Sequence, residues 1–180
     1  MKSFLFTSIF SLFAILFVQA QNCDLLISED KVIDDIHILR TEPQTLVVRG
    51  SYSYSITIRN ERKGILATMT SKAGVEFNQD DEIIFMDANR VRKSYRFIGS
   101  SESDRSGEIP VFSNVLQLDM AAVKWLSGTS INTIYLKNNI DNQMRKFTVN
   151  ANRQTEFKQM ASCFIQKLDP NMVNDTEINA

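Results

Sequence analysis

The sequence predicts an α+β domain, with a mainly antiparallel β-sheet, a short helix and a C-terminal amphipathic helix packed on the sheet. Residues 52–59 alternate apolar and polar side chains, which is the period of a half-buried strand. Further short apolar stretches are separated by polar turns, as antiparallel hairpins require. Residues 152–168 instead carry apolar side chains at helical spacing. Strands closed by a helix are typical of the α+β class.

The chain begins with a segment typical of export. Lys2 precedes an apolar stretch over residues 4–18, and residues 18–20 end it with small or branched side chains at its exit. This order is typical of a cleaved secretory signal peptide, here residues 1–20. The stretch is shorter than the roughly 20 residues that a membrane-spanning helix needs. We therefore expect signal cleavage and no transmembrane segment in the mature chain.

Cleavage leaves residues 21–180. We expect residues 21–168 to form a single β-rich globular domain, because about 150 residues bury a sizeable core. Residues 169–180 are expected to form a disordered tail. Loss of Lys2 leaves 19 basic and 21 acidic residues, and this near-neutral balance argues against a nucleic-acid partner. The expected protein is secreted or periplasmic, with an unknown protein or envelope component as its partner.

The two cysteines, Cys23 and Cys163, lie near the two ends of the expected domain. An even pair in an oxidising compartment favours a disulfide. Such a bridge would close a loop of about 140 residues and stabilise the fold by up to about 5 kcal/mol. The alternative is a packed thiol at Cys163 and a frayed terminus around Cys23. A lipidated Cys23 is disfavoured, because lipidation needs a small residue where Asn22 stands.

The first half of the domain predicts a meander of antiparallel strands. Tyr52, Tyr54, Ile56 and Ile58 share one face of a strand. Packing of the two tyrosines within this face is favoured over a stacking platform, with Arg59, for bases or sugars. The expected elements are strand-like stretches in 32–38 and 46–48, strand 52–59, turn 60–64, strand 65–71, turn 72–74, strand 82–86, turn 87–90 and strand 91–97.

The second half predicts a polar surface loop, a strand, a short helix, a hairpin and the closing helix. Asp119 is the expected N-cap of the short helix, because its carboxylate can accept from the free amides of the first turn. Gly128 is the expected left-handed stop, and Cys163 is expected beside the apolar stripe of the closing helix. The expected elements are loop 99–110, strand 111–118, helix 120–127, strands 131–137 and 143–149, and helix 152–168.

The chemistry-bearing residues do not assemble a catalytic motif. His37 is the only histidine, so a zinc site is not expected. Its place between Ile36 and Ile38 predicts a surface or edge position on a strand. The chain has no Gly-x-Ser-x-Gly nucleophile motif and no glycine-rich phosphate loop. We therefore expect no catalytic, cofactor-binding or metal-binding residues.

Two acidic groups, Asp34-Asp35 and Asp80-Asp81-Glu82, leave an enzyme hypothesis open. Carboxylate pairs act as acid and base in glycoside hydrolysis when they lie within about 10 Å of each other. A hydrolase of envelope polymers would therefore need the two groups to face each other across a cleft. Aspartates are common in turns, so solvated turns are favoured.

Several segments follow a recognisable layout. They are strand 114–118, helix residues 123–126, strand 131–136, strand 147–149, the late cysteine segment 163–165 and the hairpin opening at 82–87. Together with the phenylalanine-rich signal segment, this layout resembles small exported proteins of unknown function from Bacteroidetes. The resemblance implies a secreted or periplasmic β-rich domain and carries over no catalytic residue.

The leading functional hypothesis is a non-enzymatic exported domain that binds a partner through its sheet or through the 99–110 loop. One alternative is the hydrolase that would use the acidic groups. Another is a carrier of a lipid or small ligand, which predicts a large apolar cavity inside the sheet.

Overall fold

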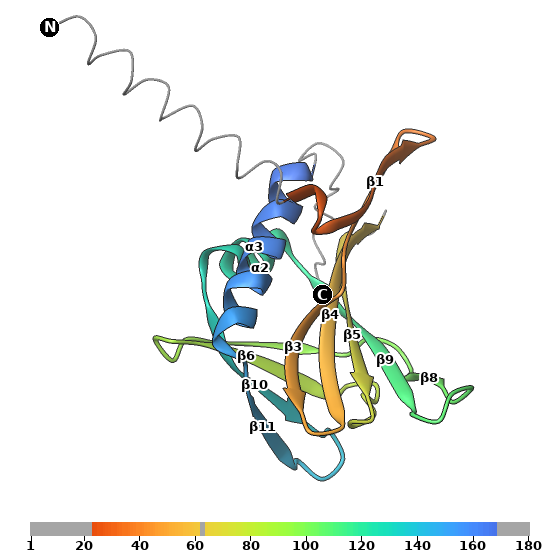
Figure 1. The fold of residues 1–180 in the computed structure, drawn as a ribbon, viewed down its shortest axis with the longest axis vertical. Coiled ribbons are helices and arrows are strands. Elements are labelled where there is room, and N and C mark those ends of the chain that lie inside the picture. The colour runs from red at the N-terminus through yellow and green to blue at the C-terminus, as the bar shows by residue number, and fades with distance from the viewer. Residues whose placement is uncertain (1–22, 62–63, 169–180) are drawn as a thin grey trace, which may run out of the picture.

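The computed structural model describes residues 23–61 and 64–168, and Figure 1 shows their arrangement. The expected signal peptide and the expected tail lie outside the described residues. All strand pairings are antiparallel and a helix closes the fold, which confirms the α+β class.

The strands are β1 (Ile27–Ile33), β2 (Ile36–Thr41), β3 (Gln44–Arg49), β4 (Tyr52–Glu61), β5 (Gly64–Lys72), β6 (Glu82–Asp87), β7 (Arg92–Arg96), β8 (Glu102–Asp104), β9 (Val111–Leu118), β10 (Ile131–Lys137) and β11 (Met144–Thr148). The helices are α2 (Met120–Gly128) and α3 (Ala151–Lys167).

Sheet A has the strand order β1-β2-β4-β5-β9-β8, with β3 beside β2 along the same edge of β4. β4 and β5 form the hairpin that the alternation predicts, in register from Ser53↔Lys72 to Glu61↔Gly64. β2 and β3 are separate strands because Pro43, which has no N–H to donate, lies between them.

Sheet B has the strand order β11-β10-β6-β7. The expected meander stops after β5, because residues 73–81 cross to the second sheet and β6 pairs with β10. Phe77 in this crossing is buried, and its ring stacks on Phe97 with the centroids 4.9 Å apart. Phe97, directly after β7, also bridges to Leu116 of β9, so the stacked pair Phe77 and Phe97 lies where the two sheets meet.

The core lies between the sheets and beneath α3. One face of each central strand is buried, as period-two alternation dictates. Phe157 of α3 lies 6.2 Å from Phe85 of β6, measured between ring centroids. Burial of such a side chain stabilises the fold by about 1.5–3 kcal/mol. Figure 1 shows α3 beside α2, near the start of the described chain.

The helix ends follow the expectations in part. Asp119 is the N-cap of α2, and its carboxylate accepts from the amide of Ala122 at 2.5 Å. The expected left-handed stop at Gly128 is wrong, since Gly128 is the last helical residue and the extended Thr129 is the C-cap. The chain passes directly into β10, and an extended exit needs no glycine at positive φ. No helix within residues 23–61 and 64–168 has the length and apolar character to cross a membrane.

The structure differs from two predictions made from the sequence, one for residues 32–38 and one for residues 99–110. Residues 32–38 are not one strand, because Asp34 and Asp35 both adopt positive φ (49° and 60°) and reverse the chain between β1 and β2. Aspartate tolerates this conformation better than most residues. Residues 99–110 are not wholly a loop, because they contain β8, which pairs with the start of β9. This pairing fastens one part of the segment to sheet A.

Candidate functional site

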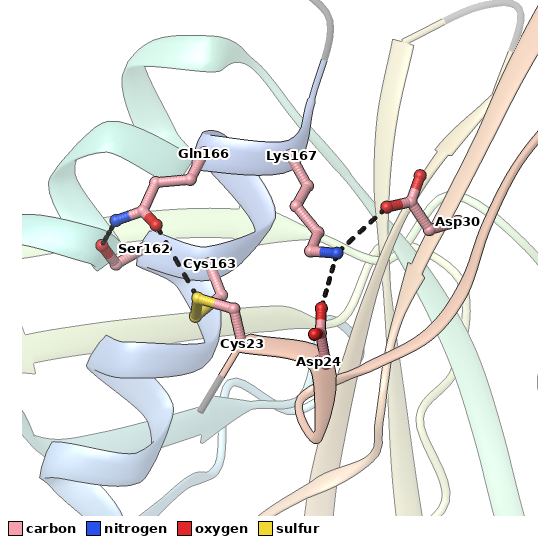
Figure 2. The surroundings of a disulfide bond; sticks show 7 residues. All are labelled: Cys23, Asp24, Asp30, Ser162, Cys163, Gln166 and Lys167. Carbon is pink, nitrogen blue, oxygen red and sulfur yellow. Dashed lines mark hydrogen bonds and ion pairs between the residues drawn. A yellow bond between two sulfur atoms is a disulfide. The ribbon is translucent and has the colours of Figure 1, made fainter. Parts of the chain in front are cut away.

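Cys23 and Cys163 form a disulfide, with 1.96 Å between the sulfurs and 5.3 Å between the Cα atoms (Figure 2). This is the pairing that the sequence predicts. Cys163 is buried, with 2% of its surface exposed, on the side of α3 that meets the N-terminal segment. The side-chain oxygen of Gln166 lies 3.7 Å from the sulfur of Cys23. Because both sulfurs are bonded, neither can act as a thiolate nucleophile.

Lys167 on α3 lies between two carboxylates of the N-terminal segment, as Figure 2 shows. Its Nζ is 2.8 Å from Asp24 and 3.2 Å from Asp30. Hydrogen bonds to these carboxylates raise the pKa of Lys167. The pKa of Asp30 is lowered, first by the hydrogen bond from His37 and then by the one from Lys167. This cluster therefore ties the N-terminal segment and β1 to the last turn of α3, beside the disulfide.

The expected surface or edge position of His37 is wrong. Its surface is 7% exposed, and β2 lies between β1 and β4. Nε2 donates to the carboxylate of Asp30 at 2.9 Å, across the β1–β2 hairpin. The hairpin register sets Val32 opposite His37, so Asp30 is its diagonal neighbour. Recognition of the Asp34-Asp35 reversal in the sequence would have identified this partner.

A groove of about 920 Å³ lies on sheet A, and we call it the sheet A groove. Residues of β2, β4, β5 and β9 line it together with the segment 99–102. It therefore includes the first part of the polar stretch that the sequence distinguishes. Its polar lining includes Arg40, Arg59, Glu61, Thr68, Ser101 and Ser113.

The sheet A groove extends to the place where β2 diverges from β4, since these strands share a single residue pair. Beyond this pair, side chains take the place of backbone groups as hydrogen-bond partners between the two strands. The amide of Leu39 donates to Oδ1 of Asn60 at 2.6 Å, and the amide of Ile58 donates to Oγ1 of Thr41 at 2.9 Å. The backbone groups of both strands are thereby paired while the strands stay apart.

Arg59 is held in the sheet A groove by two neighbours. Its Nε donates to Glu61 at 2.8 Å, and its Nη1 donates to the hydroxyl of Thr68 at 2.8 Å. A guanidinium has five N–H donors, and these bonds use two of them. The fixed guanidinium and the hydroxyls around it suit a ligand that both donates and accepts hydrogen bonds.

The two acidic groups lie in different parts of the fold. Asp34 and Asp35 form the exposed turn between β1 and β2 in sheet A. Asp81 is buried just before β6, and its carboxylate accepts from the amides of Asn78 and Asn139, both at 2.9 Å. These bonds fasten the β10–β11 loop to the turn before β6, which is a structural role.

A smaller groove of about 430 Å³ is lined by Asp81 and Glu82, together with Lys137 and Arg145. Glu82 lies 3.7 Å from the Nζ of Lys137. The aspartates of the β1–β2 turn line neither this groove nor the sheet A groove. Within residues 23–61 and 64–168, no three His, Cys, Asp or Glu side chains are grouped to hold a metal ion.

The tyrosines of β4 are packed in a sheet face, which confirms the favoured interpretation. Tyr54 is buried, with its ring centroid 4.8 Å from that of Phe147 and 6.1 Å from that of Phe77. Tyr52 lies 5.7 Å from Tyr54 between centroids. Arg59 is at an odd position of the same strand and belongs to the opposite face, so these residues do not form a stacking platform.

The sheet A groove is the largest of the described cavities and has both charges and hydroxyls in its lining. No protein-family model matches the chain, and no curated protein or solved structure matches it.

Proposed function

We propose that the protein is an exported, non-enzymatic binding domain that holds a polar segment of a protein partner in the sheet A groove. The observation that carries this proposal is Arg59, held by Glu61 and Thr68 inside a groove of about 920 Å³. A preorganised donor lowers the cost of binding, because its side chain need not be ordered anew. Lining groups of both charge signs suit a polypeptide, which carries both.

Export is part of this proposal. The order of charge, apolar residues and small residues over 1–20 supports it. The bonded sulfurs of Cys23 and Cys163 also support it, since disulfides persist in oxidising compartments. The resemblance to small exported proteins of Bacteroidetes points to the same compartment.

The settings of the reactive groups favour binding over hydrolysis. Both sulfurs are bonded, and the Nε2 of His37 is engaged by Asp30. The carboxylate of Asp81 is occupied by backbone amides. Phe77 and Phe97 stack in the core, so aromatic packing rather than an apolar ligand fills this space.

A matched pair of substitutions tests the sheet A groove. Ser113 lines the groove and Ser53 does not, although both are half-buried on the outer face of sheet A. Ser113→Arg is expected to fill the groove and weaken capture of partners from the native envelope at least about tenfold. Ser53→Arg is expected to leave capture unchanged. Quantitative mass spectrometry after pull-down with each purified variant measures the difference.

Equal capture by both variants would show that the partner binds elsewhere. Thermal unfolding of the two variants checks that both remain folded. Turnover of a glycoside, peptide or ester substrate, abolished by one substitution, would overturn the non-enzymatic part of the proposal.

A further inference from the structure

The outer face of sheet B carries a dense group of cations, and we call it the basic face. It faces away from the core because, apart from the buried Thr133, its residues on β6 and β10 alternate with the buried ones. Strand register arranges it in three rows across β7, β6, β10 and β11. The rows are Arg92–Met86–Thr133–Thr148, Ser94–Ile84–Tyr135–Lys146 and Arg96–Glu82–Lys137–Met144.

The charge of the basic face differs in sign from that of the whole chain. Arg92, Arg96, Lys137 and Lys146 stand against Glu82 on the face and Asp80 at its margin, where Asp80 lines a small hollow with Arg96 and Lys137. The full sequence, by contrast, has a net charge of −1. A concentration of positive charge on one face of a near-neutral protein creates a local field that attracts anions. The partner chemistry that complements this face is therefore polyanionic.

The cations surround an apolar centre. Ile84, Met86 and Tyr135 occupy the middle of the face and are half-buried. The guanidinium carbon of Arg92 lies 5.5 Å from the centroid of the Tyr135 ring, and the Tyr135 hydroxyl lies 3.9 Å from the sulfur of Met86. The Tyr135 side chain thus contacts both Arg92 of β7 and Met86 of β6.

We propose that the basic face binds an acidic polysaccharide. Sugar rings combine apolar C–H faces with charged substituents, which matches an apolar centre with cations around it. A bilayer fits less well, because the central apolar side chains are half-buried and do not project for insertion. An acidic peptide strand would gain backbone pairing at a sheet edge, whereas this surface is a sheet face. The proposal is independent of the sheet A groove, which belongs to the other sheet.

Binding to polygalacturonate, a polymer with one carboxylate per sugar, tests the proposal directly. Arg96→Glu/Lys146→Glu reverses two exposed cations of the basic face. We expect it to weaken binding about tenfold or more at low salt, since two attractions become repulsions. The matched control is Arg49→Glu/Lys124→Glu, which reverses two exposed cations of β3 and α2 and gives the same net charge. The control is expected to bind as the wild type does.

Further binding measurements distinguish an acidic polysaccharide from the other classes of partner. Tyr135→Ala is expected to weaken binding to polygalacturonate more than binding to poly-L-glutamate, because only the sugar polymer offers rings to the centre. Equal weakening by the two charge-reversal pairs would overturn the assignment to the basic face. Stronger binding to poly-L-glutamate, or to phosphatidylglycerol vesicles, than to polygalacturonate would overturn the choice of polysaccharide. Loss of binding in Ser113→Arg would show that the site is the sheet A groove instead.

Discussion

Gly74 lies where the chain leaves β5, against Tyr54 and Ser71. A Cβ at this position would stand 2.5 Å from the Ser71 hydroxyl oxygen and 2.7 Å from the Tyr54 hydroxyl oxygen. Both neighbours are buried, with 0% and 3% of their surfaces exposed, so neither can move aside cheaply. Gly74→Ala is expected to lower the free energy of unfolding by about 1–3 kcal/mol, measured by urea denaturation.

Gly107 provides the matched control for this prediction. A Cβ at Gly107 meets no atom within 4 Å, and its φ is not positive. Gly107→Ala is expected to change the free energy of unfolding by less than about 0.5 kcal/mol. Equal free energies of unfolding for Gly74→Ala and Gly107→Ala would contradict the close packing of Tyr54 against Gly74 at the end of β5.

At the scale of elements, the contact between β1 and α3 depends on charge. The lowered pKa of Asp30 means that its contribution to stability is present above the unfolded value, about 3.9, and is lost as pH falls through the folded pKa. The raised pKa of Lys167 means that its contribution is present below about 10.4 and is lost as pH rises through the folded pKa. The cluster is therefore expected to stabilise the fold between these limits.

Lys167→Met tests this window. Both ion pairs are partly exposed, so the expected loss in the free energy of unfolding at neutral pH is about 0.5–1 kcal/mol. The loss is expected to diminish as pH falls from neutral through the folded pKa of Asp30, because this carboxylate then becomes protonated. Urea denaturation of the variant and the wild type across this range measures it. A difference that does not depend on pH would exclude the charge of Asp30 as its cause.

At the scale of the whole molecule, the disulfide joins the start of the described chain to its last helix, across a sequence separation of 140 residues. Cys23→Ser/Cys163→Ser is expected to lower the free energy of unfolding by about 2–5 kcal/mol, because the unfolded chain regains the freedom that the loop removes. Intact mass is expected to rise by two hydrogens on reduction of the wild type. An unchanged mass would contradict the bridge.

The positions of the two proposed surfaces also belong to this scale. The sheet A groove arises where β2 diverges from β4, and the basic face arises where β6 pairs with β10. Neither pairing joins strands that follow one another along the chain. For this reason the alternation of individual strands identifies which residues face outward, but not which of them become neighbours.

Local patterns in the sequence are enough to predict the individual helices and strands. Alternation over residues 52–59 predicts β4 and the packed tyrosine face, Asp119 marks the start of α2, and the apolar spacing of residues 152–168 predicts α3. Cys23 and Cys163 can pair only with each other, because the sequence has no other cysteine. These features depend on local backbone preference, on periodicity or on a single possible pairing.

The partners of His37, Asp81 and Arg59 depend instead on how the strands assemble. His37 is buried because the Asp34-Asp35 reversal sets β1 against β2, and Asp81 is engaged because the β10–β11 loop reaches it. Arg59 gains its fixed position only when β4 and β5 pair. A side chain's partners follow from which strands become adjacent, and adjacency is set by burial of the whole core rather than by any local pattern.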